Sequence, residues 1–106
     1  MIPTIEMPCR VDFRPAAARE FCEWTGRIHQ LSATGCSIQT VHTPEPGARL
    51  ELRIYLPGNA WPMQVQGAQV VWNHWGEFTV EFLQLSLDDQ DQLHHCLGEA
   101  SALAAA

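Results

Sequence analysis

The sequence contains no lysine, and its six basic residues, all arginines, are outnumbered by twelve acidic ones. A formal net charge of −6 at pH 7 argues against a protein that binds DNA or RNA by general electrostatic attraction, because such proteins carry a basic face. Guanidinium groups suit paired contacts with phosphate, so an arginine-bearing segment can still hold a small anion. A genome-wide bias in base composition would explain the absence of lysine equally well.

Long apolar runs are also missing, and no stretch approaches the roughly 20 residues that a membrane-spanning helix needs. The first residues carry neither the basic nor the apolar region of a secretory signal, so we expect a cytoplasmic protein. The four cysteines, Cys9, Cys22, Cys36 and Cys96, form no CxxC pair, which favours buried free thiols over a disulfide framework. With 106 residues, 46% of them hydrophobic, the chain is expected to fold as one domain, residues 1–106.

Catalytic and metal-binding patterns are lacking as well. Ser32 has no G-x-S-x-G setting, and His29 is better explained as a solvated strand residue than as a general base, so we expect no enzyme. His94, His95 and Cys96 resemble a metal cluster, but adjacent helical residues point about 100° apart and cannot all bind one ion. The sequence therefore predicts neither a metal nor a cofactor.

Alternating apolar and polar residues instead predict six short β-strands. They start near Met7, Trp24, Cys36, Arg49, Met63 and Phe78. The clearest is the fourth, in which Leu50, Leu52, Ile54 and Leu56 are expected to face inward. The alternation changes phase at Gly67, which predicts a β-bulge in the fifth strand and places Trp72 in the core. Among the other tryptophans, Trp24, Trp61 and Trp75, the turn residue Trp75 is the best candidate for an exposed contact.

A change to helical spacing follows residue 85. Ser86 with Asp89 forms a capping-box-like start, and Leu93, Cys96 and Leu97 share one face. We expect a helix over about residues 87–98, ending at Gly98. No connection between strands is long enough for a crossover helix, so the sequence predicts an all-β fold, a six-stranded antiparallel β-barrel over about residues 7–84, closed by this C-terminal helix.

The segment between the second and third strands, residues 26–38, is the centre of the functional hypothesis. Ser32, Ala33, Thr34 and Gly35 keep bulk away from the backbone and leave room for a ligand. Gly35 is the natural position for a positive φ angle. An ordinary tight connection in an all-β domain would also fit this pattern.

In the order of these segments the chain resembles the PilZ domain family, as a divergent member. The resemblance rests on the Ser32 loop, on residues 47–57, on Ala68-Gln-Val-Val-Trp72, and on Glu77-Phe-Thr-Val-Glu-Phe82 leading into a helix; it covers about residues 7–98. PilZ domains are six-stranded barrels with a C-terminal helix, and many are bacterial receptors for cyclic di-GMP. The resemblance thus implies a regulatory module with cyclic di-GMP as its candidate ligand.

The family's ligand signature is RxxxR followed by (D/N)xSxxG. The second motif reads Gln30-x-Ser32-x-x-Gly35 here, and Gln30 keeps a carbonyl acceptor on a side chain that is one methylene longer. Arg10-Val-Asp-Phe-Arg14 has the spacing of the first motif, but it lies on the predicted first strand, whereas the family's arginines usually precede that strand. The resemblance therefore implies that Arg10, Arg14, Gln30, Ser32 and Gly35 bind the ligand.

Two hypotheses follow. In the first, the domain is a cyclic di-GMP receptor that uses these residues, supported by Arg19 or Arg27, and acts in trans on a partner protein. In the second, the same barrel is an adaptor that binds another protein without nucleotide.

Overall fold

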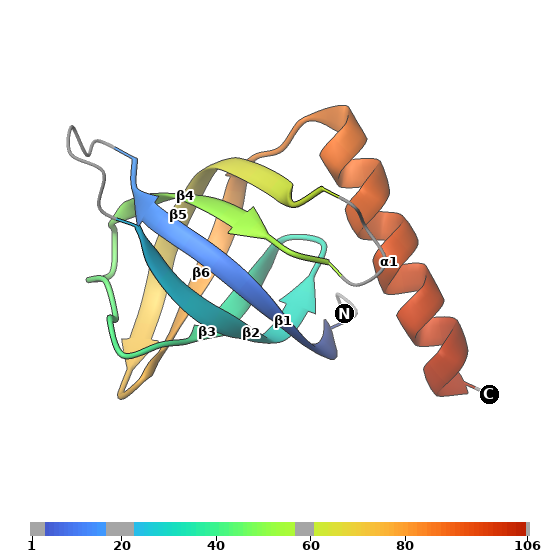
Figure 1. Ribbon diagram of the computed structural model, residues 1–106, viewed down its shortest axis with the longest axis horizontal. Coiled ribbons are helices and arrows are strands. Elements are labelled where there is room, and N and C mark those ends of the chain that lie inside the picture. The colour runs from blue at the N-terminus through green and yellow to red at the C-terminus, as the bar shows by residue number, and fades with distance from the viewer. Residues whose placement is uncertain (1–3, 17–22, 57–60, 106) are drawn as a thin grey trace.

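The computed structural model describes residues 4–16, 23–56 and 61–105, which form six strands and one helix (Figure 1). In chain order these are β1 (Thr4–Pro15), β2 (Trp24–Ser32), β3 (Gly35–Gln39), β4 (Arg49–Ile54), β5 (Met63–His74), β6 (Glu77–Gln84) and α1 (Leu87–Ala105). All strand pairs are antiparallel, and the sheet closes in the order β1-β2-β3-β6-β5-β4. The predicted six-stranded antiparallel barrel with a C-terminal helix is confirmed.

The barrel encloses a single apolar core. On β4, Leu50, Leu52 and Ile54 are buried, and Leu56 beyond the strand is buried too, as the alternation predicts. The rings of Phe13 on β1 and Phe78 on β6 meet edge to face with centroids 5.1 Å apart, an arrangement that aromatic pairs favour. Because inward and outward residues alternate along each strand, the polar residues between them form the outer wall, where any ligand must bind.

Two irregularities shape β5. Its register shifts between Gly67 and Ala68 against β6, as the bulge prediction requires. A second shift, between Val70 and Trp72, turns the next residues outward, and Trp72 is 47% exposed. The prediction that Trp72 lies in the core is therefore wrong, because the extra residue of this second bulge reverses the alternation at that point.

Several element boundaries differ from the sequence-based ones. Strand β1 begins at Thr4 rather than near Met7, and residues 4–6 pair with the end of β2. Strand β5 continues to His74 and strand β6 begins at Glu77, so Trp75 and Gly76 form a two-residue turn between them. Gly76 has a φ of +72°, which suits this turn because glycine enters the left-handed region without steric cost.

The helix α1 lies at one end of the barrel, while the β5–β6 turn and the β3–β4 connection lie at the other (Figure 1). The Ser86 hydroxyl accepts a hydrogen bond from the Asp89 amide (3.1 Å) and donates one to the Asp89 carboxylate (2.8 Å), so the predicted cap is confirmed. Leu93 and Leu97 are buried against the core. The helix does not end at Gly98 but continues to Ala105, because the alanine-rich sequence that follows favours helix.

Candidate functional site

The Ser32 loop joins β2 to β3 in a tight turn that the Ser32 side chain holds together. Its hydroxyl accepts a hydrogen bond from the Thr34 amide (3.3 Å) and donates one to the Gly35 carbonyl (3.2 Å). This is the local bonding by which serine stabilises turns. The loop is therefore held by hydrogen bonds of its own side chain.

Gly35 is required at this position because strand β6 approaches it closely. A Cβ atom there would lie 2.1 Å from the carbonyl oxygen of Val80 on β6, far inside van der Waals contact. The expected positive φ at Gly35 is wrong: in the described part of the chain, only Gly47 and Gly76 have positive φ angles. Gly35 pairs with Glu81 as part of an extended strand, so the glycine serves close packing and not a left-handed turn.

Gln30, Ser32 and Gly35 line one pocket of about 280 Å³ on the outer wall formed by β2, β3, β5 and β6. We call it the Ser32 pocket; its other lining residues are Thr34, Cys36, Ser37, Val71, Thr79, Val80 and Glu81. Ser37 and Thr79 share a hydrogen bond of 2.9 Å between their hydroxyls across β3 and β6. The three loop residues of the predicted site therefore do come together, in a pocket rich in hydroxyl groups.

The charge of the Ser32 pocket is unfavourable for an anion. Glu81 is its one ionisable carboxylate, and no arginine occurs among the lining residues that the structure describes. A phosphodiester ligand would meet a negative charge there without a cation to offset it.

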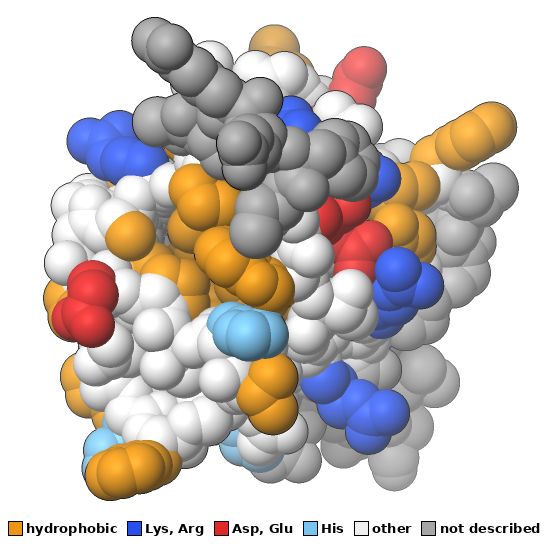
Figure 2. Space-filling model, turned by 60° about the vertical axis from the view of Figure 1, so that its left-hand side comes forward, with side chains coloured by type: hydrophobic (Ala, Val, Ile, Leu, Met, Phe, Trp, Pro, Cys, Tyr) orange, Lys and Arg blue, Asp and Glu red, His pale blue; other side chains and the backbone are white. Residues whose placement is uncertain are grey.

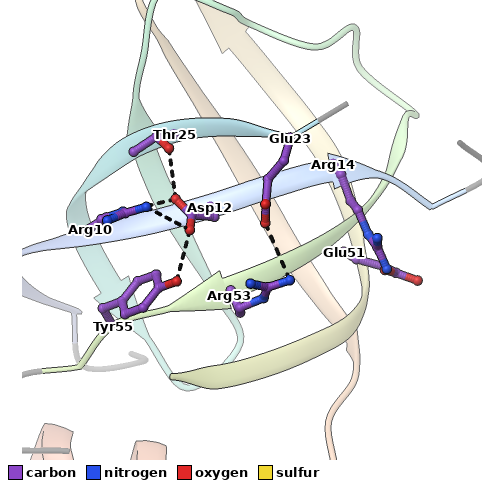
Figure 3. A network of polar contacts seen from close by, with 8 residues as sticks. All are labelled: Arg10, Asp12, Arg14, Glu23, Thr25, Glu51, Arg53 and Tyr55. Carbon is purple, nitrogen blue, oxygen red and sulfur yellow. Dashed lines mark hydrogen bonds and ion pairs between the residues drawn. The ribbon is translucent and has the colours of Figure 1, made fainter. Parts of the chain in front are cut away.

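The two arginines of the predicted site lie elsewhere on the outer wall (Figure 3). Arg10 sits on β1 opposite Arg27 of β2 and makes two hydrogen bonds of 3.1 Å to the carboxylate of Asp12. Arg14 lies opposite Glu51 of β4 and donates a hydrogen bond of 2.7 Å to its carboxylate. Both arginines are thus carried by a paired strand and bonded to neighbouring acids. Arg19, proposed as a supporting cation, lies outside the described residues.

Arg14 lines a second pocket, of about 420 Å³, between β1, β4 and β5. This pocket also contains Glu23 and Arg53, whose side chains form an ion pair at 3.7 Å, and the glutamines Gln64, Gln66 and Gln84. It shares no residue with the Ser32 pocket. The structure therefore divides the predicted site residues between two places on the barrel wall and does not assemble them around one cavity.

Asp12, between the two arginines on β1, is the centre of a buried polar network (Figure 3). It is 4% exposed and also accepts hydrogen bonds from Thr25 Oγ1 (2.8 Å) and Tyr55 Oη (3.0 Å). Burial disfavours its charge, but the hydrogen bonds from Arg10, Thr25 and Tyr55 outweigh that effect, and the pKa of Asp12 is lowered. No local sequence pattern signals this network, because Tyr55 is far from Asp12 along the chain.

Two of the four thiols are buried. Cys9 and Cys36 are buried free cysteines, as expected, and burial raises the pKa of Cys9 to about 11. Cys96 is half-buried, and Cys22 lies outside the described residues. Within the ranges that the structure covers, no group of three or more His, Cys, Asp or Glu side chains is placed to hold a metal ion.

The chain thus forms a closed six-stranded barrel with one terminal helix, with pockets on its outer wall. The sequence profile of the PilZ domain matches residues 5–99, and the chain belongs to this family. PilZ is a cyclic di-GMP-binding fold, and its domains serve as regulatory and binding modules. No curated protein sequence matches the chain.

Solved structures agree with this assignment of the fold. The chain is similar to the PilZ domain of Escherichia coli YcgR with cyclic di-GMP, at 14% identity and a TM-score of 0.73, over 97% of this chain and 92% of that one. It is also similar to the PilZ domain of CeSA from a cellulose-synthesizing bacterium, at 14% identity and a TM-score of 0.70, over 92% and 96%.

A third similar structure is the Bacillus subtilis inhibitor of motility MotI/DgrA, at 19% identity and a TM-score of 0.68, over 92% of this chain. The match covers 49% of that protein, so the chain spans about half of its length. Within the described ranges, no helix combines the length and apolar character needed to cross a bilayer.

Proposed function

We propose that this chain is a PilZ adaptor: a single-domain, non-enzymatic regulatory module of the bacterial cytoplasm that acts in trans by binding another protein and does not require cyclic di-GMP. The separation of Arg10 and Arg14 from the Ser32 pocket supports the proposal most directly. An anionic dinucleotide needs cations beside its phosphates, and in the described residues those cations are bonded to Asp12 and Glu51 on another part of the wall.

The position of the arginines matters more than the strength of their ion pairs. Exposed ion pairs contribute only about 0 to 1 kcal/mol, so a ligand could displace Glu51 from Arg14 at little cost. The backbone that carries the two arginines is harder to move than their ion pairs are to break, because β1 is paired with β2 at Arg10 and with β4 at Arg14. These pairs fix the backbone of β1, so Arg10 and Arg14 can approach the Ser32 pocket only through movement of their side chains.

A cyclic di-GMP receptor is the second candidate, and one observation favours it. Gln30, Ser32 and Gly35 line the same pocket, and four of its lining residues carry a hydroxyl group. In this version Arg10 and Arg14, with Arg27 in support, would reach the nucleotide from the neighbouring wall, and binding would alter the surface offered to the partner.

Titration calorimetry with cyclic di-GMP separates the two candidates. The adaptor proposal predicts no binding heat at millimolar nucleotide, for the native chain and for Glu81→Gln, which removes the carboxylate of the pocket. Micromolar binding that is abolished by Arg14→Ala and by Ser32→Ala would overturn it in favour of the receptor. Arg49→Ala is the matched control, since Arg49 is an exposed arginine that lines neither the Ser32 pocket nor the pocket of Arg14.

Action in trans needs a separate measurement. Chemical cross-linking of the chain in its native host, followed by mass spectrometry, should give one protein that also binds the purified chain with the same affinity with and without cyclic di-GMP. A purified complex whose affinity changes at least tenfold with the nucleotide would contradict nucleotide independence.

A further inference from the structure

The end of the barrel opposite α1 carries an apolar groove that neither candidate function uses. The side chains of Pro15, Trp24, Val41, His42, Thr43 and Pro44 line a hollow of about 410 Å³ between the β1, β2 and β3–β4 segments. We call it the end groove. Figure 2 shows hydrophobic side chains gathered on this face, with histidine beside them.

Aromatic rings form the centre of the end groove. The Trp24 indole packs inward against Phe13, with centroids 5.8 Å apart, and outward against the His42 imidazole at 5.6 Å. Pro15 and Pro44 line the same hollow as this pair of rings. Trp24 is half-buried and packs against the core, so the aromatic wall that it forms with His42 is held in place.

The end groove continues into a second hollow at the β5–β6 turn. Val41 and Thr43 line both hollows, and the second one, of about 380 Å³, also contains Asn73, His74 and Trp75. Val41 is 90% exposed and Trp75 is 93% exposed, so two large apolar side chains face water at this end. Exposed apolar surface of this kind marks sites of interaction.

The shape and charge of this strip restrict its occupant. Among the described residues that line either hollow there is no Asp, Glu, Lys or Arg, so an uncharged segment fits it best. The two hollows share Val41 and Thr43 and lie next to each other, and such an elongated surface suits an extended chain.

The mode of binding follows from the topology. A closed barrel has no free strand edge, so an extended partner cannot be added to this sheet as another strand. A polyproline II segment needs no such edge, because its recognition rests on rings packed against aromatic side chains and on single donors to its carbonyl groups. The Thr43 hydroxyl is a donor of that kind, and so is the second N–H of the Asn73 amide, whose nitrogen already donates to the Pro44 carbonyl (3.2 Å).

We propose that the end groove binds a proline-rich, uncharged extended segment of a partner protein. The proposal rests on the proposed action through a protein partner and names the chemistry of that partner. It does not depend on whether cyclic di-GMP binds.

The test is a titration of the ¹⁵N-labelled chain with acetylated decaproline, followed through the indole N–H resonances. We expect the signals of Trp24 and Trp75 to shift in a saturable way at millimolar peptide. The signal of Trp61, an exposed tryptophan two residues before β5 and at the opposite end of that strand from the β5–β6 turn, should remain unchanged. An acetylated decapeptide of alternating glycine and serine should shift none of them.

Two variants keep the test independent of folding, because both positions are almost fully exposed. Val41→Glu and Trp75→Ala should each weaken decaproline binding at least fivefold, while Trp61→Ala leaves it unchanged. The proposal would be overturned if no saturable shifts occurred, or if the Trp61 signal shifted as much as those of Trp24 and Trp75. It would also be overturned if the chain did not respond to decaproline but self-associated, and Val41→Glu abolished that self-association. The calorimetric titration with cyclic di-GMP does not depend on any of these results. The proposed function and the peptide-binding groove are therefore tested independently.

Discussion

The Arg10 guanidinium lies over the ring of Tyr55, 5.0 Å from its centroid, and both side chains bind the carboxylate of Asp12. The cation–π contact and the shared acceptor fix the two side chains relative to each other on the barrel wall. Arg10 therefore has two side-chain partners on the barrel wall, Asp12 and Tyr55.

Tyr55→Phe separates the two contributions of this tyrosine. The variant keeps the ring beneath Arg10 and loses only the hydroxyl donor to Asp12, so we expect a loss of about 1 kcal/mol in the free energy of unfolding. Urea denaturation would measure it. An unchanged stability would show that water replaces the hydroxyl and that the bond contributes nothing.

Asp12→Asn should cost more, about 1 to 3 kcal/mol, because it leaves the donors Arg10 and Thr25 with a weaker, neutral acceptor. The effect depends on pH. Asp12 has a lowered pKa in the folded chain, so its contribution is present above its ordinary value of 3.8 and is lost as the pH falls through the folded value. The difference in stability between native chain and variant should therefore be largest near neutral pH and shrink in acid below about pH 4. A difference that stays constant down to pH 2 would exclude this carboxylate as the cause.

Gly35→Ala and Gly98→Ala are expected to change stability in opposite directions. At Gly35 the new methyl group would meet the Val80 carbonyl oxygen at 2.1 Å, so β3 and β6 must separate, at a cost of about 3 kcal/mol or more. At Gly98, among the described residues, the added Cβ has nothing within 4 Å besides its chain neighbours and the backbone of its own helix, and alanine replaces glycine within a helix, which should stabilise the chain by about 0.5 to 1 kcal/mol. Thermal unfolding of both variants checks the pair, and equal shifts of the same sign would contradict the described packing.

Ser86→Ala removes the hydroxyl that accepts from the Asp89 amide, and we expect a loss of about 1 kcal/mol. Ser86→Asp restores an acceptor at the start of the helix and should recover much of this loss. Its recovery will be incomplete, because the Ser86 hydroxyl also donates to the Asp89 carboxylate, which would repel a second carboxylate. Circular dichroism during denaturation would report both effects.

The sequence predicts the architecture because its strands alternate cleanly, and β4 shows this best. The prediction that Trp72 is buried is wrong because the second bulge of β5 contains no glycine that would indicate it in the sequence. The sequence finds the right glycine at residue 35 for the wrong reason, since the constraint is the approach of β6, which comes from far along the chain. Long-range contacts also explain why the network of Asp12 was missed: Asp12 and Tyr55 are 43 residues apart, and period-2 spacing marks both simply as outward-facing.

The pairing of β3 with β6, which joins residues 35–39 to residues 77–81, has a consequence for biosynthesis. While the ribosome is still making β5, β3 has only β2 as a neighbour, and its other backbone edge is open to any strand nearby. A nascent chain that stalls before residue 77 would carry this unprotected edge together with exposed core residues, which is the composition of an aggregation-prone fragment. We therefore expect chains that stop before residue 77 to aggregate more readily than the chain of residues 1–106.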